Sequence, residues 1–218
     1  MLSAMRGHLL GFAFTALLGA CATGNAASPT ATSCSSDMLC LRTVGTQPGP
    51  LMPGRLVVVW DPLSKREGPP EVAFDVPFSG AERALAIPFA KIAPPRTRMP
   101  TMPCEPSRGP ACQRFVGIAV GYVLVLGDRN GNGRIDPDEI GKNALFGAAR
   151  VIVGFAEEPI APSPDLAPAG MAAGLAAYAP VRLGSFDKWQ LVAPGTVFDL
   201  VVCAQGEPNC HPPVPNLT

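Results

Sequence analysis

This chain of 218 residues has few histidines and no net charge. It has two histidines, and its 17 basic residues balance 17 acidic ones, so the formal net charge is zero. Without a basic surplus, the chain lacks the charge that neutralises the phosphates of a nucleic acid. Charged residues make up 16% of the chain and apolar residues 47%. This composition excludes an acidic disordered tail, and the apolar residues are numerous enough to fill one folded core. We therefore expect no nucleic-acid partner.

Catalytic motifs are also missing. The sequence has no G-x-S-x-G, H-E-x-x-H or G-x-x-x-x-G-K-[ST] pattern. Glu157 and Glu158 are adjacent acids, but neighbouring residues of a strand face opposite sides and make poor partners for acid–base work. His211, beside Cys210, is more typical of a surface residue than of a general base. We therefore expect a protein that is not an enzyme.

The first 21 residues have the pattern of an export signal. Arg6 and His8 precede an apolar run over 9–18, which is shorter than the roughly 20 residues that a membrane-spanning helix needs. The run ends in Leu18-Gly19-Ala20-Cys21, which resembles the lipobox of bacterial lipoproteins. An ordinary secretory signal, with Cys21 lost or unmodified, is the alternative.

The resemblance implies a signal peptide over 1–20 and a lipid on the sulfur of Cys21, which becomes the new N-terminus. Several acyl chains, at about 0.8 kcal/mol per buried CH₂, anchor a protein durably where one chain would not. Ala22 follows instead of the aspartate that would favour the inner membrane. The expected location is therefore the periplasmic face of the outer membrane, with the membrane reached through Cys21.

The rest of the chain divides into a tether and a body. Residues 21–50 are rich in Ala, Thr, Ser, Gly and Pro, which predicts a flexible linker. Residues 51–218 predict an all-β domain, because 26 prolines and 23 glycines favour strands and turns over long helices. We expect a single antiparallel β-sandwich of immunoglobulin-like type, with a small barrel as the alternative. The predicted strands cover residues 56–60, 72–78, 84–89, 115–126, 151–155 and 196–202.

Two stretches of this body need comment. Residues 115–126 place six apolar residues on one face at a period of two, while Gly117, Ala119 and Gly121 on the other face predict the close approach of another layer. Residues 160–180 are rich in Ala and Pro and predict a long loop, since Gly170 and Gly174 weaken a short helix over 171–178. Pro88 predicts that 84–89 is either an edge strand or a strand break.

Seven cysteines leave six once Cys21 is set aside. Six cysteines allow 15 connectivities, and the sequence alone does not choose between them. They occur as three close pairs around turns, so local disulfides in an oxidising compartment are the simplest prediction. A thiolate zinc site is the weaker alternative, because there is no C-x-x-C. The predicted pairs are Cys34–Cys40, Cys104–Cys112 and Cys203–Cys210.

One segment has the pattern of a metal-binding loop. Residues 128–139 resemble the twelve-residue calcium loop of EF-hand proteins, with apolar Ile135 at the eighth place and Gly133 at the sixth. Ca²⁺ takes six to eight oxygens, and Gly133 permits the positive φ of the sharp turn. Arg134 would contribute its backbone carbonyl, and Glu139 two carboxylate oxygens. The predicted ligands are Asp128, Asn130, Asn132, Arg134, Asp136 and Glu139.

The resemblance covers the loop and not the domain around it. A strand replaces the entering helix, Gly141 limits any exiting helix to about one turn, and there is one loop where calcium sensors use paired hands. A metal-free Asn-Gly turn is the alternative. We expect a structural calcium site with an affinity of about 10⁻⁴–10⁻³ M.

Two functions remain open. The first is a membrane-anchored calcium-binding module of the cell envelope that is not an enzyme. The second is a carrier or substrate-binding lipoprotein in which calcium only rigidifies one loop, which would need an apolar pocket or a cleft lined by Trp60 or Trp189. The sequence identifies no protein partner.

Overall fold

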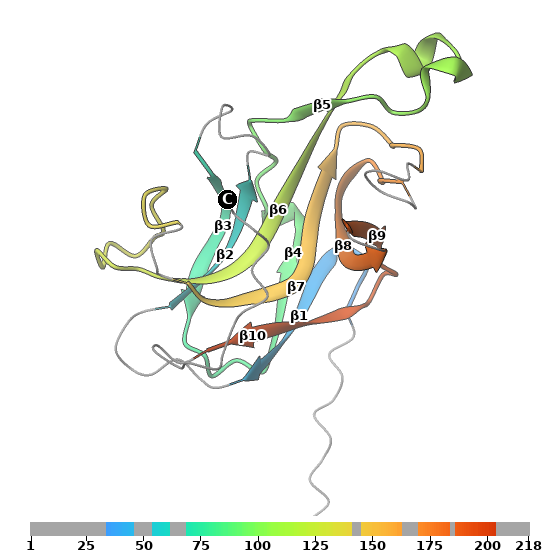
Figure 1. Ribbon diagram of the computed structural model, residues 1–218. Coiled ribbons are helices and arrows are strands. Elements are labelled where there is room, and N and C mark those ends of the chain that lie inside the picture. Colours follow the sequence, from blue (N-terminus) through green and yellow to red (C-terminus); the bar gives the residue numbers. More distant parts are fainter. Residues whose placement is uncertain are drawn as a thin grey trace, which may run out of the picture. The chain divides into compact units, whose positions relative to one another are not determined.

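The computed structural model of the protein describes residues 34–45, 54–61, 69–140, 145–162, 170–183 and 186–203. Within these residues the regular secondary structure consists of strands and a few short 3-10 turns, and no helix is long and apolar enough to cross a bilayer (Figure 1). The strands are β1 (Met38–Gly45), β2 (Gly54–Asp61), β3 (Glu71–Phe78), β4 (Ala84–Pro88), β5 (Met99–Thr101), β6 (Val116–Gly127), β7 (Leu145–Ala156), β8 (Gly174–Leu183), β9 (Phe186–Leu191) and β10 (Val197–Val202). Three short 3-10 turns are η1 (Phe89–Lys91), η2 (Pro106–Arg108) and η3 (Pro110–Gln113). The predicted all-β class is confirmed.

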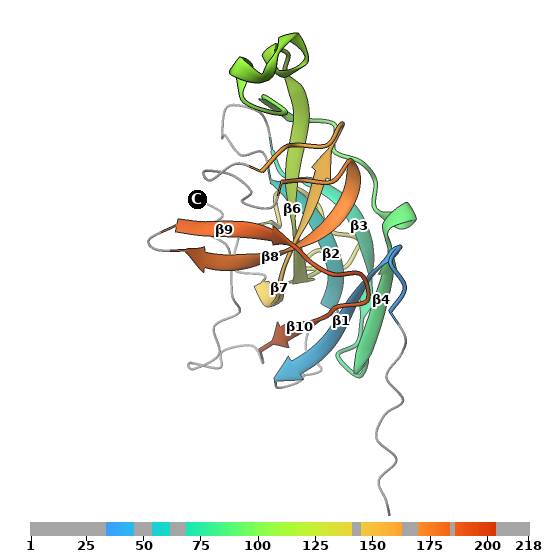
Figure 2. The same ribbon diagram turned by 90° about the vertical axis from the view of Figure 1, so that its right-hand side faces the viewer.

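The strands form one continuous sheet that curls (Figures 1 and 2). The main order is β3-β2-β6-β7-β10-β1-β4, while β5 pairs with β6, β8 with β7 and β9 with β8. The pairs are antiparallel except β1 and β10, which run parallel with Cys40 opposite Val197. The sheet is therefore mixed, and the predicted immunoglobulin-like antiparallel sandwich is not confirmed.

Six of the strands overlap the predicted ones, and two others correct the sequence analysis. β1 lies inside the range predicted as a linker, although Leu39 and Leu41 are buried at 1% exposure. The Ser- and Thr-rich flanks hide this short apolar run. β8 begins inside the range 160–180 predicted as a loop or short helix and extends past it to Leu183. Pairing with β7 and burial of Tyr178 outweigh the helical preference of its alanines.

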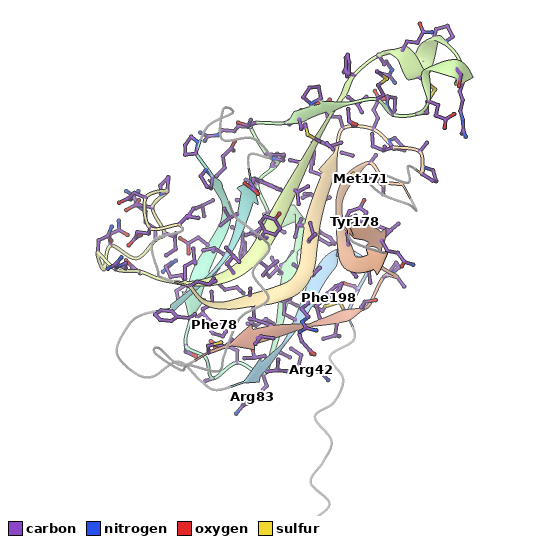
Figure 3. The ribbon with its side chains drawn as sticks, viewed as in Figure 1. Arg42, Phe78, Arg83, Met171, Tyr178 and Phe198 are labelled. Atoms are coloured by element: carbon purple, nitrogen blue, oxygen red, sulfur yellow. A yellow bond between two sulfur atoms is a disulfide. The ribbon has the colours of Figure 1, made fainter. Side chains whose placement is uncertain are left out.

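Apolar side chains gather on both faces of the sheet. An inner cluster draws buried residues from β1, β2, β3, β4, β6, β7 and β10, among them Trp60 and Leu200. An outer cluster covers the other face of β2, β6 and β7 and includes Ile135, Met171 and Tyr178 (Figure 3). The predicted period of two along β6 is confirmed, because alternate residues belong to the outer cluster: Val116, Ile118, Val120, Tyr122, Leu124 and Leu126.

Glycines in the central strands make room for aromatic rings of the neighbouring strands. Gly121 lies opposite Trp60, and a Cβ on Gly121 would come within 2.7 Å of the Trp60 ring. The Trp60 indole Nε1 donates to the carbonyl of Ala93 at 2.8 Å, which fixes the ring. Gly154 faces the Tyr178 ring in the same way, at 2.4 Å. The small residues predicted on β6 thus accommodate a cross-strand ring at Gly121.

We expect Gly121→Ala to lower the free energy of unfolding by about 1–3 kcal/mol, because the fixed Trp60 ring leaves no space for a methyl group. Ala86→Ser is the control, since Ala86 is exposed on β4. Urea unfolding of both variants with the disulfides intact measures the effect. Equal midpoints for Gly121→Ala and the wild type would contradict it.

The chain has two tyrosines, Tyr122 and Tyr178. Burial, together with the nearby Asp61 carboxylate, raises the pKa of Tyr122 to about 12. Burial also raises the pKa of Tyr178, against the smaller lowering effect of the Ala172 N–H, which donates to the Tyr178 hydroxyl at 3.0 Å. Ionisation therefore begins at higher pH in the folded state than in the unfolded state for both rings.

We expect the tyrosinate absorbance of the folded protein to rise at higher pH than that of the unfolded protein, whose tyrosines have the ordinary pKa of about 10. Because the folded-state pKa values are raised, the associated stability is present below that pH and is lost as the pH rises toward about 12. Ultraviolet absorbance titration of folded and urea-unfolded protein compares the two states. A native step of two tyrosines near the unfolded value would contradict the burial of both hydroxyls.

Candidate metal site

The loop predicted to bind calcium begins where β6 ends. Gly127, the last residue of β6, pairs with Gly54 of β2, and Asp128 follows directly. Among the described residues, Asp128 and Glu139 are the buried carboxylates, at 4% and 5% exposure. A buried carboxylate is costly unless its charge is matched by hydrogen-bond donors or a cation. The two ends of the loop are therefore its most constrained positions.

The Asp128 carboxylate organises the turn. The N–H of Gly131 donates to Oδ1 and the N–H of Gly133 donates to Oδ2, both at 2.8 Å. Both glycines have positive φ, 68° and 80°, which residues with a Cβ rarely adopt. The predicted positive φ at Gly133 is confirmed. The chain thus wraps around the first carboxylate of the loop.

Asn130 and Asn132 continue the wrap. Each side-chain oxygen accepts the N–H two residues on, from Asn132 and Arg134 respectively, at 3.0 Å. Each side-chain amide then donates to Oδ2 of Asp136, at 2.9 and 2.8 Å. These two bonds lower the pKa of Asp136, and Arg134, 3.1 Å from Oδ1, adds to the effect. Asp136 is therefore held in its ionised form.

Glu139 ties the two ends of the loop together. Its Oε1 accepts the N–H of Arg129 at 2.8 Å and that of Asn130 at 3.3 Å. Its Oε2 accepts the N–H of Asp136 at 2.9 Å, the contact of a helix capping box. The chain after Asp136 makes a hydrogen-bonded turn and not a helix over the described residues 137–140. Glu139 therefore links the two ends of the loop through hydrogen bonds to backbone N–H groups.

The eighth loop residue fixes the loop to the sheet. Ile135 is buried in the outer cluster. Its N–H donates to Oδ2 of Asp75 on β3 at 2.9 Å, and Oδ1 of Asp75 forms an ion pair with Nε of Arg55 on β2. The sequence analysis missed Asp75. The available signal is an acid in the interior of β3, between the apolar residues Phe74 and Val76.

The loop contains oxygen atoms of the kinds that bind a hard cation. All six predicted ligand residues lie within one hydrogen-bonded loop, and their oxygens are carboxylate, amide or backbone carbonyl oxygens, the ligands that Ca²⁺ takes. In the described part of the chain, however, no three His, Cys, Asp or Glu side chains converge as a metal-binding group. Asn occupies two of the ligand places, and the carboxylates of Asp128 and Glu139 face backbone N–H groups. The residue types fit calcium, while the carboxylates of Asp128 and Glu139 accept hydrogen bonds from the backbone of the loop.

The predicted disulfides are confirmed for two pairs. Cys34–Cys40 and Cys104–Cys112 are bonded, with Cα–Cα distances of 6.0 and 5.0 Å. Cys203 is also disulfide-bonded. Its predicted partner Cys210, the lipidation candidate Cys21 and His211 lie outside the described residues.

The remaining candidate residues have structural contacts. Glu157 accepts the N–H of Gly117 at 2.7 Å and pairs with Arg98, and these contacts lower its pKa. Glu158 pairs with Arg114, so the adjacent acids have separate partners, although they follow β7 and are not residues of a strand. Trp60 is a buried core residue whose indole N–H donates to the carbonyl of Ala93.

A small apolar groove lies between β8 and the beginnings of β1 and β10. Its volume is about 150 Å³. Pockets for small molecules typically measure about 300–1,000 Å³. The groove is lined by residues that include Met38, Phe89, Leu175, Leu191 and Phe198.

Comparison with known proteins gives no relative: no family model matches the chain, and no curated protein or solved structure is significantly similar to it.

Proposed function

We propose that the protein is an exported lipoprotein whose β domain binds one calcium ion in the loop of residues 128–139. The observation that carries the proposal is that Asp128 and Glu139, the first and twelfth loop residues, are the buried carboxylates of the described chain. A buried carboxylate needs hydrogen-bond donors or a cation to match its charge. A metal-free Asn-Gly turn does not account for acids at the first, ninth and twelfth loop positions together.

The proposed ligands have distinct roles. Asp128, Asn130 and Asn132 offer side-chain oxygens from the first half of the loop, and Arg134 offers its carbonyl. Asp136 and Glu139 offer carboxylates from the second half. A bound calcium ion would link the two halves of the loop, so the proposed site is structural. Its expected dissociation constant is about 10⁻⁴–10⁻³ M. We propose no opening of a hydrophobic groove.

The hydrogen bonds of Glu139 reduce the free energy that calcium binding can gain. Its Oε1 accepts two N–H donors, which fills its two lone-pair positions. To act as a bidentate ligand, Glu139 has to release at least part of this bonding. Part of the interaction energy therefore replaces existing hydrogen bonds, which favours weak over tight binding.

We expect isothermal titration with Ca²⁺ to give a saturable heat for the wild type and a strongly reduced affinity for Glu139→Gln. Losing one charged ligand to a cation costs more than losing a neutral one. Asp138→Asn is the matched control, because it removes the same charge from the eleventh loop position, which supplies no ligand. The same affinity for Glu139→Gln and Asp138→Asn would exclude Glu139 as a ligand.

The proposed location is the periplasmic face of the outer membrane, with a lipid on Cys21. It is supported by the lipobox-like segment and by disulfides, which persist in oxidising compartments. We expect Cys21→Ser in the full chain to move the protein from the detergent-extracted membrane fraction to the soluble periplasmic fraction. Ala22→Ser is the control. Equal membrane fractions for both variants would argue against an anchor at Cys21.

The second candidate function, a carrier or substrate-binding lipoprotein, has one observation in its favour. The groove beside Phe198 is apolar, but its volume of about 150 Å³ suits a small fragment rather than a metabolite. We therefore favour the calcium-binding module, without enzymatic activity. We also keep an immunoglobulin-like sandwich as the proposed fold type, because the inner cluster joins β1, β4 and β10 to β2, β3 and β6 across the curl.

A further inference from the structure

We propose that Asp75 is a positioning residue of the calcium loop, which orients the one ligand that comes from the backbone. The proposal rests on the calcium function proposed above. Asp75 belongs to β3 and lies 60 residues before the loop residue that it contacts. It is not one of the proposed ligands.

The contact fixes one peptide unit. Oδ2 of Asp75 accepts the N–H of Ile135 at 2.9 Å. That N–H belongs to the same planar peptide as the carbonyl of Arg134, the proposed seventh-position ligand. In a trans peptide the N–H and the C=O point in opposite directions. By holding the N–H, Asp75 directs the Arg134 carbonyl away from β3.

The hydrogen bond also polarises the peptide. An anionic acceptor on the N–H draws positive charge toward the nitrogen and leaves more negative charge on the carbonyl oxygen. A more negative oxygen is a better ligand for a hard cation. Asp75 thus affects both the direction and the charge of the Arg134 carbonyl without approaching the ion.

Asp75 is itself held in place. Its Oδ1 pairs with Nε of Arg55, and both side chains are largely buried, at 16% and 12% exposure. Arg55 lies on β2, which pairs with β3 along most of its length. Ile135 is fixed by a second contact, the burial of its side chain in the outer cluster. The peptide between Arg134 and Ile135 is therefore rigid before any cation binds, which lowers the entropy cost of binding.

A matched control exists on the same strand. Glu71 on β3 also accepts backbone N–H donors, from Arg96 at 3.0 Å and Thr97 at 2.9 Å. These residues belong to the segment after η1 and not to the calcium loop. Glu71→Ala therefore removes the same kind of contact from β3 and leaves Ile135 untouched.

The test measures calcium affinity by titration calorimetry and, separately, the urea midpoint in the presence of a chelator. We expect Asp75→Ala to weaken calcium binding by about 10–100-fold, the usual effect of removing an outer-sphere partner. Glu71→Ala should lower the midpoint and keep the wild-type affinity. Asp75→Asn, whose side-chain oxygen still accepts the Ile135 N–H, should restore part of the affinity. A merely structural role for Asp75 would change midpoints and not the calcium affinity.

The outcomes separate this inference from the function on which it rests. Calcium binding that is absent from the wild type would overturn both. Wild-type affinity in Asp75→Ala would overturn the positioning role alone and leave the calcium site standing. If Asp75→Ala does not fold, Arg55→Met and Asp75→Asn decide, and unchanged affinity in both would overturn the role.

Discussion

The burial of β6 on both faces is the constraint on which the rest of the structure depends. Every residue of the strand except Gly117 is buried, and its two faces belong to different apolar clusters. A shift of one residue in its pairing with β2 or β7 would exchange the two faces and break both clusters. Because Asp128 comes directly after this strand, the pairing of β6 also fixes the position of the first residue of the loop.

The outer strand β3 makes a different contribution. A strand at the end of the sheet order has one side without a strand partner, so it tolerates polar residues that a central strand would not. Glu71 and Asp75 use this freedom, and each accepts backbone N–H groups from a segment that lacks strand pairing of its own. Backbone donors in irregular segments need partners when they are close to a core. β3 therefore organises the segments around it through its acids as well as through its own pairing.

Local patterns in the sequence predicted local structure well. The period of two along β6, the edge position of β4 and the positive φ of Gly133 each depend on residues close in sequence, and each is found. The two close cysteine pairs followed from the same reasoning. The predictions that failed depended on distant partners. β1 is a strand because it pairs with β4 and β10, and β8 is a strand because it pairs with β7 and β9. The local composition of β1 and β8 does not reveal these partners.

The candidate site divides in the same way. The places of Asp128, Gly133 and Glu139 in one closed loop could be predicted from spacing, because the hydrogen bonds of the two carboxylates lie within the loop. Their binding of calcium stays a prediction. Asp75 could not, since its link to Ile135 spans 60 residues and depends on which strand ends up beside the loop. The direction of the carboxylates, toward N–H groups, is likewise a property of the folded loop and not of the motif.

The parallel pair of β1 and β10 has a consequence for how the chain folds. In the described sheet, β4 pairs only with β1, and β1 reaches the rest of the sheet through β10, the last strand to be synthesised. Until residues 197–202 are available, both earlier strands lack a place in the sheet, although β2, β3, β6 and β7 can already pair. Such long-range closure slows folding. A chain with this topology keeps β1 and β4, paired with each other, apart from the rest of its sheet until residues 197–202 are added, so the sheet closes late in the synthesis of the described strands.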